Sequence, residues 1–463
     1  MRRGWTWALP AFALLLVFVL GARLVARTGR AAYALPPERS APSVDPVRVE
    51  PASLSDDVVF VGTGGDREDG WPRRSVDRTA LRALLAAGRT HELTAQLEDL
   101  QADFEAEPRH ERWIHEAALA FFFADPSLDA AIDAWAQSEG SSFAPFLARC
   151  VHLNAVGWDR RGERTIAATS REAIDGMTEA MTRAAADCER ALELRPRLVV
   201  ARQRLISMAA ALGRPAEITV QLGRALEVCP TCLRVRTVAY MFRTPRWGGS
   251  LAWIRADADQ AIHSHPEAPY LRMLAGAVDE ELCQVERDPR RRLAHCDAAI
   301  AAGADAFLSR ARARLRNAGE HPELAEALVL SDLESALDRD PQFVDTLTMH
   351  AERIAAREPE RAIREYLTAA RLDPTDAAVI AGVEWSRERT RLLAAEAARR
   401  GAAPEVERLR QLGRQLGLSA DDVGTWGAVA TAPLAVPVVA DGVSPIVPPQ
   451  APTSGEAEPA PSP

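Results

Sequence analysis

A short segment of the sequence recurs after 34 residues, and this period constrains the fold more than any other feature. Residues 191–196 read Ala-Leu-Glu-Leu-Arg-Pro, and residues 225–230 read Ala-Leu-Glu-Val-Cys-Pro. A repeat of this length holds two antiparallel helices, and each pair buries its apolar face only by packing against neighbouring pairs. The sequence therefore predicts an all-α solenoid.

One unit of the repeat, starting at Val199, carries residues with separate structural roles. Leu205 is expected to fill the gap between the paired helices, and Gly213 to allow the turn between them. Ala225 permits close helix approach, and Pro230 ends the second helix. In these positions the unit resembles the tetratricopeptide repeat. The resemblance implies a tetratricopeptide-like helical-repeat solenoid that binds another protein.

The same style continues nearer the C-terminus. Ala336 and Ala369 are separated by 33 residues, and each lies five residues before a proline. Helical spacing of apolar residues begins at Val76 and persists with short breaks. The predicted organisation comprises a transmembrane anchor at 1–30, a flexible linker at 31–75, a helical domain at 76–265, repeats at 266–403, a capping helix at 404–426 and a disordered Pro/Ala-rich tail at 427–463.

The N-terminus contains an uncharged, mostly apolar run from Gly4 to Ala22. Its 19 residues suffice to cross a bilayer core. The alternative is a cleaved signal peptide, because Ala32-Tyr33-Ala34 has the form of a cleavage site. Arginines flank the run on both sides, so the positive-inside count is nearly balanced. We expect an uncleaved single-pass anchor in the inner (cytoplasmic) membrane, with the body outside the cytoplasm.

A second resemblance rests on scattered motifs rather than on the period. The chain resembles a bacterial family known as domain of unknown function 4034, over roughly residues 76–265. The most specific motif is the hexapeptide 245–250, Pro-Arg-Trp-Gly-Gly-Ser. The other matching positions are Trp135, Leu147-Ala148-Arg149, Gly157-Trp158, Arg161-Gly162 and Thr169. The family has no assigned activity, so the resemblance implies a domain and no catalytic residue.

Composition excludes several functions. The net charge of −9 argues against general nucleic-acid binding. All 56 basic residues are arginine, and both a P-loop nucleotide site and a Schiff-base mechanism require a lysine. We expect no cofactor.

The hexapeptide is the first candidate site. The backbone N–H groups of Gly249 and Ser250, with Arg246 beside them, are placed to bind a carboxylate or phosphate. In this interpretation the hexapeptide is the centre of an enzyme or of a ligand-binding domain. The other interpretation is structural: Gly248 and Gly249 allow the turn, Ser250 caps the next helix, and Trp247 packs under a neighbouring pair.

The second candidate is the inner surface formed by the first helix of each pair. Gln203, Arg204 and Ser207 of one unit are expected to face it, with Arg234 and Thr237 of the next. Arginine side chains there suit a peptide carboxylate. They would otherwise be ordinary solvated arginines.

Six cysteines include Cys229 and Cys232, which flank a predicted repeat junction. A thioredoxin-like redox pair would need a βαβ context that is missing here. Outside the cytoplasm we expect disulfides between Cys229 and Cys232 and between Cys283 and Cys296. Inside it, the cysteines would be small core residues.

One histidine lies in a motif that resembles part of a zinc-binding helix but lacks the second zinc ligand. His115-Glu116 starts like a zinc-protease helix, but position 119 is leucine, so the second ligand is missing. We expect His115 to pair with Glu111 one turn earlier. The sequence therefore indicates no metal site and no catalytic residue.

Overall fold

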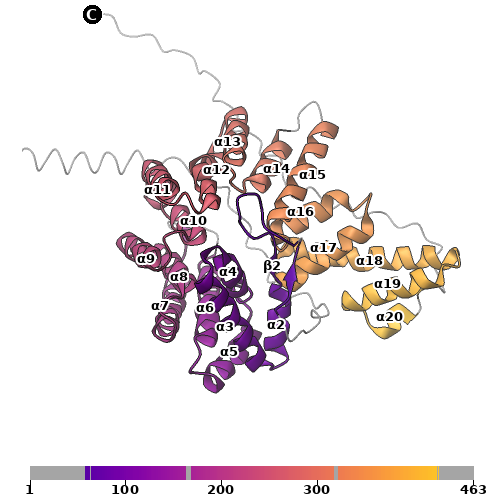
Figure 1. Cartoon of the computed structure of the whole chain (residues 1–463). Coiled ribbons are helices and arrows are strands. Elements are labelled where there is room, and N and C mark those ends of the chain that lie inside the picture. The colour runs from indigo at the N-terminus through magenta and orange to yellow at the C-terminus, as the bar shows by residue number, and fades with distance from the viewer. Residues whose placement is uncertain (1–57, 63, 163–167, 318–321, 425, 427–463) are drawn as a thin grey trace, which may run out of the picture. The chain divides into compact units, whose positions relative to one another are not determined.

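The computed structural model describes residues 58–62, 64–162, 168–317, 322–424 and 426, all within one compact unit. Nineteen α-helices, α2 to α20, make up most of this described part, together with a single two-stranded sheet (Figure 1). Consecutive helices pack against one another along the chain. The structure thus confirms the predicted all-α helical-repeat fold.

The helix bounds are as follows. The first group comprises α2 (Arg78–Ala86), α3 (Thr90–Ala106), α4 (Glu111–Leu119), α5 (Pro126–Ser138), α6 (Ala144–Arg161) and α7 (Arg171–Leu194). The second comprises α8 (Val199–Ala211), α9 (Pro215–Val228), α10 (Leu233–Met241), α11 (Leu251–Ser264), α12 (Ala277–Val285) and α13 (Pro289–Ala301). The third comprises α14 (Phe307–Arg316), α15 (Pro322–Arg339), α16 (Val344–Ile354), α17 (Pro359–Leu372), α18 (Ala377–Arg399), α19 (Ala403–Gln415) and α20 (Ala420–Gly424). Short 3-10 helices are η1 (Pro108–His110), η3 (Pro245–Trp247) and η4 (Pro269–Gly276).

The unit formed by α8 and α9 shows how the sequence specifies a helical pair. Leu205 and Ala225 are buried in the shared core, as expected. Gly213 has φ +67°, a left-handed conformation that glycine adopts without a steric penalty, and it reverses the chain after α8. Pro215 then occupies the first turn of α9, where its missing N–H leaves no helical hydrogen bond unmade.

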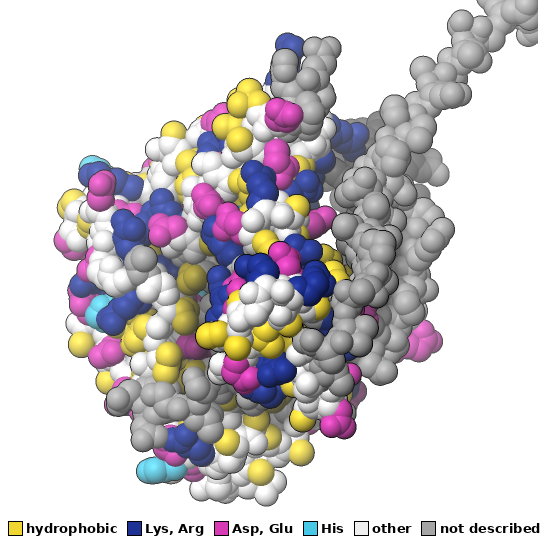
Figure 2. Space-filling view, turned by 90° about the vertical axis from the view of Figure 1, so that its right-hand side faces the viewer, with side chains coloured by type: hydrophobic (Ala, Val, Ile, Leu, Met, Phe, Trp, Pro, Cys, Tyr) yellow, Lys and Arg dark blue, Asp and Glu magenta, His cyan; other side chains and the backbone are white. Residues whose placement is uncertain are grey.

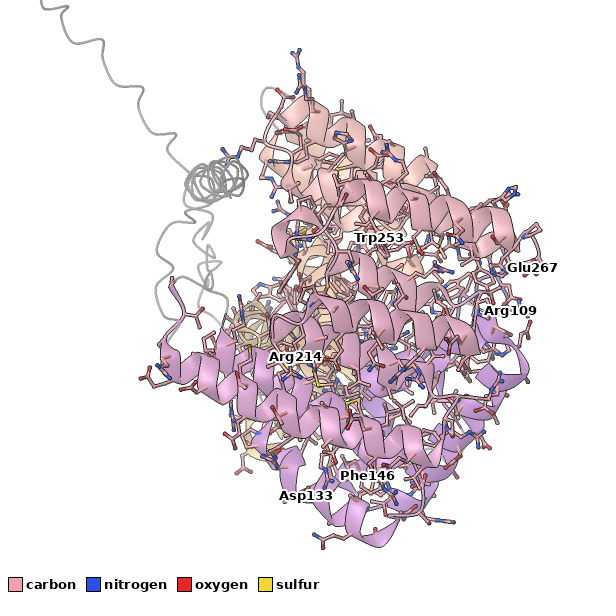
Figure 3. The ribbon with its side chains drawn as sticks, turned by 90° about the vertical axis from the view of Figure 1, so that its left-hand side faces the viewer. Arg109, Asp133, Phe146, Arg214, Trp253 and Glu267 are labelled. Carbon is pink, nitrogen blue, oxygen red and sulfur yellow. A yellow bond between two sulfur atoms is a disulfide. The ribbon has the colours of Figure 1, made fainter. Side chains whose placement is uncertain are left out.

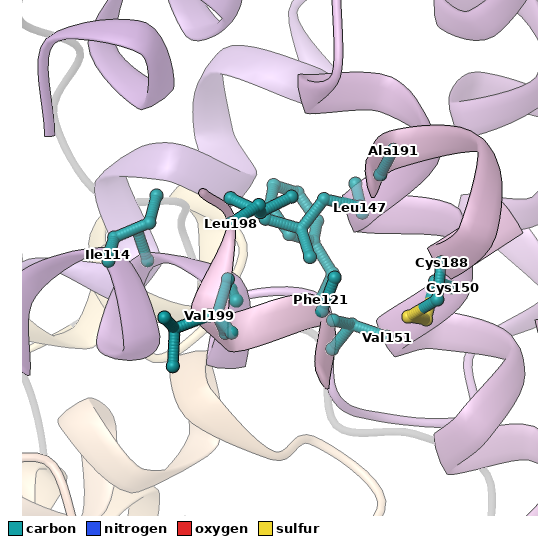
Figure 4. Close-up of a cluster of buried hydrophobic side chains, with 14 of the residues drawn as sticks. Ile114, Phe121, Leu147, Cys150, Val151, Cys188, Ala191, Leu198 and Val199 are labelled. Carbon is teal, nitrogen blue, oxygen red and sulfur yellow. A yellow bond between two sulfur atoms is a disulfide. The ribbon is translucent and has the colours of Figure 1, made fainter. Parts of the chain in front are cut away.

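A continuous hydrophobic core runs from α2 to α10. Figure 4 shows part of it, where Phe121, Leu147 and Leu198 meet beside a disulfide between Cys150 and Cys188. That disulfide joins α6 to α7. The two helices lie very close, because a Cβ added at Gly157 of α6 would come within 2.8 Å of the Met181 side chain of α7.

We expect removal of this disulfide, in the double variant Cys150→Ala/Cys188→Ala, to lower the free energy of unfolding by about 3–4 kcal/mol. The cross-link spans 38 residues and therefore restricts the unfolded chain strongly. The matched control is Cys229→Ala/Cys232→Ala, whose cross-link spans 3 residues and should contribute about 2 kcal/mol less. Urea unfolding under non-reducing conditions measures both, and equal losses would contradict the loop-length argument.

The described end of the predicted linker differs from the expectation of a flexible tether. Phe60–Val61 (β1) and Ser75–Val76 (β2) form an antiparallel hairpin that packs against α4 (Figure 1). Trp71 in its loop is 2% exposed and packs on Tyr270 of η4, with ring centroids 5.1 Å apart. The tether prediction is therefore wrong for residues 58–62 and 64–75, because burial of this indole holds the hairpin on the helices.

The hairpin also contacts a segment far away in the sequence. Gln342, between α15 and α16, donates from Nε2 to the Val76 carbonyl at 2.6 Å and accepts at Oε1 from the Arg78 backbone N–H at 3.0 Å. Arg112 of α4 donates to the Arg339 carbonyl at 2.7 Å. Residues 72–78 thus join the start of the described helices to the α15–α16 connection.

The predicted anchor at 1–30 and the tail at 427–463 lie outside the described residues. Within the described ranges, no helix is both long enough and apolar enough to cross a bilayer. The predicted domain boundaries remain predictions.

Candidate functional site

Arg204 of α8, one of the predicted groove residues, is a buried charge that forms no ion pair with a carboxylate of the described residues. It is 7% exposed, and its guanidinium lies 5.2 Å from the ring centroid of Phe122. Its Nε has no hydrogen-bond partner among the described residues. Burial lowers the pKa of Arg204 to about 10, which still leaves it charged at neutral pH.

Arg234 of α10 is in a similar position. Its guanidinium lies 5.9 Å from the ring centroid of Trp71, and its buried Nε also lacks a partner within the part of the chain that is described. The other predicted polar groups are occupied. The hydroxyl of Ser207 accepts from Trp158 Nε1 at 3.2 Å, and that of Thr237 donates to the Arg234 carbonyl at 2.9 Å.

His115 of α4 lies near enough to both arginines for their charges to act on it. Its Nδ1 lies 2.6 Å from Oε1 of Gln203, a residue of α8. Burial lowers the pKa of His115 well below its usual value, and the charges of Arg204 and Arg234 lower it further. The ring is therefore neutral at pH 7 and adds no charge of its own beside the two arginines. We call His115, Gln203, Arg204 and Arg234 the arginine cluster.

The expected pair between His115 and Glu111 is not formed. His115 contacts Gln203 instead, while Glu111 accepts backbone N–H groups at the start of α10. Because a buried helix places its polar groups against neighbouring helices, spacing within one helix does not determine their partners.

Arg82 of α2 is a further residue of this type that the sequence did not single out. Its guanidinium lies 4.2 Å from the ring centroid of Phe123, and its buried Nε has no partner among the described residues. Burial lowers its pKa to about 9. Phe122 and Phe123 are consecutive, so one aromatic pair lies beneath two arginines from different helices.

Many arginines of the described residues are paired with carboxylates. Arg149 of α6 binds Asp187 at 2.7 and 2.8 Å. It also binds Asp133, which is labelled in Figure 3, at 3.0 Å. Figure 2 shows basic and acidic side chains interspersed over another face. Against this background, Arg204 stands out because it is buried and no carboxylate of the described residues lies within ion-pair distance of it. The charge of Arg234, in contrast, acts on the carboxyl groups of Glu111, Glu280 and Asp305.

The hexapeptide 245–250 has the geometry of a structural corner. The Gly249 N–H donates to the Thr244 carbonyl at 3.0 Å, and Arg246 binds Glu281 at 2.8 Å. These donors are therefore engaged within the protein rather than open to an anion. A Cβ at Gly249 would lie 1.9 Å from the Arg243 carbonyl oxygen, so the close chain approach requires glycine.

The other residues of this corner have equally local roles. Gly248 has φ +82°, and the Ser250 hydroxyl accepts from the Trp253 N–H at the start of α11. Trp247 is 38% exposed, and its ring packs against Phe242 and Trp158 at centroid distances of 5.1 and 6.1 Å. This aromatic contact matches the structural interpretation of the hexapeptide.

The cysteines are joined in three pairs. The structure links Cys229 to Cys232 at the α9–α10 junction and Cys283 to Cys296 between α12 and α13, in addition to the bond in α6 and α7. Cys229 and Cys232 are buried, so neither sulfur is presented at an open site. Across the described ranges, no group of three or more His, Cys, Asp or Glu side chains is arranged to hold a metal ion.

Comparison with known proteins identifies a family model over part of the chain. Residues 77–224 match the model described as Domain of unknown function (DUF4034). No curated protein matches the sequence.

Two solved structures are similar in fold only. "Crystal structure of YrrB: a TPR protein with an unusual peptide-binding site" is 15% identical, covers 54% of this chain and 96% of its own, and has a TM-score of 0.19. "Human IFIT1 dimer with m7Gppp-AAAA" is 15% identical, covers 75% of this chain and 78% of its own, and has a TM-score of 0.30. At these TM-scores neither structure adds to what the chain itself shows.

Proposed function

We propose that this protein is a helical-repeat scaffold that binds a protein or peptide partner through the arginine cluster. The observation that carries the proposal is the buried guanidinium of Arg204, which has no carboxylate partner among the described residues. A charge removed from water is costly unless it is paired, so such a group is typical of a site completed by a ligand.

The chemistry of the cluster favours a carboxylate. A guanidinium presents a planar fork of donors that matches two carboxylate oxygens, and the ring of Phe122 holds the fork in place from one side. Arg234 supplies a second positive charge, and its buried Nε has no hydrogen-bond partner among the described residues. His115 is neutral, and burial raises the pKa of the neighbouring Glu111 to about 8, so that this carboxyl group is protonated at pH 7. A peptide that ends in a carboxylate, or carries Asp or Glu at this point, would neutralise the site.

The location of this scaffold is part of the same proposal. The apolar run from Gly4 to Ala22 suits a single-pass anchor in the bacterial inner membrane. Three disulfides are typical of proteins outside the cytoplasm, where thiols are oxidised. Together these features support a body held in the cell envelope. A reporter fused to the C-terminus, active on one side of the membrane only, tests the orientation.

We expect Arg204→Met to weaken binding of acidic peptides by 10- to 100-fold, which is about 1.5–3 kcal/mol. Methionine keeps the apolar stem over Phe122 and removes the charge. The same change should leave the free energy of unfolding unchanged or raise it, because an unpaired buried charge is removed. Arg234→Met should likewise weaken peptide binding without lowering the free energy of unfolding.

The measurement uses an array of acidic peptides with free C-terminal carboxylates, beside the same peptides as amides. The matched control is Arg183→Met, which removes an exposed arginine of α7 and should change neither binding nor stability. If Arg204→Met bound the peptides normally, or if it unfolded the protein, Arg204 would have a structural role and the proposal would be wrong.

A further inference from the structure

A second site, separate from the arginine cluster, lies between helices of the C-terminal repeats. A pocket of about 830 Å³ is lined by residues of α16, α17 and α18 and by Arg312 of α14. Its apolar lining includes Met349, Tyr366, Trp385 and Leu392. The rings of Tyr366 and Trp385 lie 6.0 Å apart, so the pocket has an aromatic wall.

Small residues keep this pocket open. A Cβ at Gly382 would lie 2.1 Å from the Tyr366 ring, so glycine lets that ring lie flat against α18 instead of filling the space. Ala378 and Ala381 on the same helix line the pocket and are exposed. Arg389 also lines it, and its buried Nε has no hydrogen-bond partner among the described residues. The charged residues of the lining are Arg312, Arg389, Asp345, Glu352, Asp376 and Glu388, so the pocket combines an aromatic wall with a rim of mixed charge.

We propose that this pocket binds residues 433–449 of the same chain. That segment reads Pro-Leu-Ala-Val-Pro-Val-Val-Ala-Asp-Gly-Val-Ser-Pro-Ile-Val-Pro-Pro. Proline-rich segments with apolar residues are recognised by aromatic-lined grooves, because their backbone loses little conformational entropy on binding. Asp441 is the only charged residue of the segment, so most of its surface is apolar and suits the aromatic wall of the pocket.

The point at which the tail leaves the body favours the chain's own tail over another occupant. Trp426 belongs to a buried cluster with Ala394 and Ala397 of α18, the helix that forms one wall of the pocket. From Ala394 to Trp385 the helix rises by about 14 Å at ~1.5 Å per residue. Residues 427–433 in extended form span about 23 Å. The segment therefore reaches the pocket without strain.

Attachment also raises the occupancy of the pocket. A segment joined by a short flexible connection has an effective concentration in the millimolar range, which saturates a contact too weak to persist between separate molecules. This proposal goes beyond the function proposed for the arginine cluster and does not depend on it.

The test is amide hydrogen exchange on the full chain and on the chain lacking residues 427–463. Deletion should increase exchange several-fold in α16 and the first half of α18. A synthetic peptide of residues 431–450 should restore the protection. Ala381→Arg, which fills the pocket from an exposed position, should reproduce the deletion in the full chain. Ala377→Arg, on an exposed position of α18 outside the pocket lining, is the matched control and should exchange like the parent.

Two results would overturn the proposal. Unchanged exchange after deletion would show that the tail does not cover the pocket. Protection that grows with protein concentration would assign the pocket to the tail of a second copy. Acidic-peptide binding, measured on the same deleted chain, should be retained, so failure here is distinguishable from failure of the function proposed for the arginine cluster.

Discussion

Replacing Arg112 by methionine is expected to lower the free energy of unfolding by about 3–5 kcal/mol. Arg112 lies in α4 with its side chain 2% exposed, and its Nε donates to Glu116 Oε1 at 2.7 Å. The change leaves the buried Glu116 carboxylate without its counter-charge. It also removes the donor to the Pro72 carbonyl in the hairpin and the donor to the carbonyl of Arg339, the last residue of α15.

The effect should be localised as well as large. Glu116 accepts from the Ser75 hydroxyl and the Val76 N–H, both at 3.1 Å, so its reorganisation releases the hairpin. Limited proteolysis should cut residues 58–76 in Arg112→Met under conditions that leave the parent intact. Chemical unfolding gives the total loss. The control, Arg171→Met, removes an arginine whose pair with Asp175 is fully solvated and should cause no measurable change. Equal behaviour of the two variants would contradict the predicted role of Arg112.

The repeat architecture could be predicted from the sequence, because local rules determine it. The burial of Leu205 and Ala225 and the left-handed Gly213 follow from one unit alone. The hairpin could not be predicted in this way. Glycines around it are typical of a linker, and its order depends on Trp71 meeting Tyr270 about 200 residues later. Likewise, six cysteines permit fifteen pairings, and the sequence did not indicate the bond between Cys150 and Cys188.

The candidate site could be predicted only in part, because local rules determine which residues face it but not which partners they have. Arg204 and Arg234 follow from their positions in the first helix of a pair. The missing hydrogen-bond partners of their Nε atoms among the described residues could not be predicted from these positions, because they depend on which groups the fold brings near. His115 was placed with a neighbour on its own helix, whereas the structure pairs it with Gln203, 88 residues away. Long-range packing therefore determines the electrostatics of the site, while local periodicity determines only which residues face it.

A second large effect is expected from pH, through Glu111 of α4. Glu111 is buried, and its Oε1 accepts from the backbone N–H groups of Leu233 and Arg234 at the start of α10. Its Oε2 is buried without a hydrogen-bond partner in the described part of the chain. Burial raises the pKa of Glu111 to about 8, although the two N–H groups and the charges of Arg234 and Arg236 act in the opposite direction.

The raised pKa fixes the sign of the pH dependence. An unfolded glutamate titrates near 4.5, so between about pH 4.5 and 8 the folded state keeps a proton that the unfolded state has released. The free energy of unfolding should therefore be highest below this window and fall by about 3–5 kcal/mol as pH rises through it. Glu111→Gln should remove that part of the slope, because an amide does not titrate.

The slope, rather than the stability at one pH, is the decisive measurement for Glu111→Gln. The amide introduces a buried N–H₂ group whose cost is the same at every pH, so it shifts the whole curve without changing its shape. Glu280, whose pKa burial raises to about 7, contributes a similar decline to both proteins and cancels in the difference. Glu227→Gln, at an exposed position of α9, should retain the slope of the parent. If Glu111→Gln also retained it, Glu111 would be ionised in the folded protein, and the start of α10 would be held by a charged rather than a neutral carboxyl group.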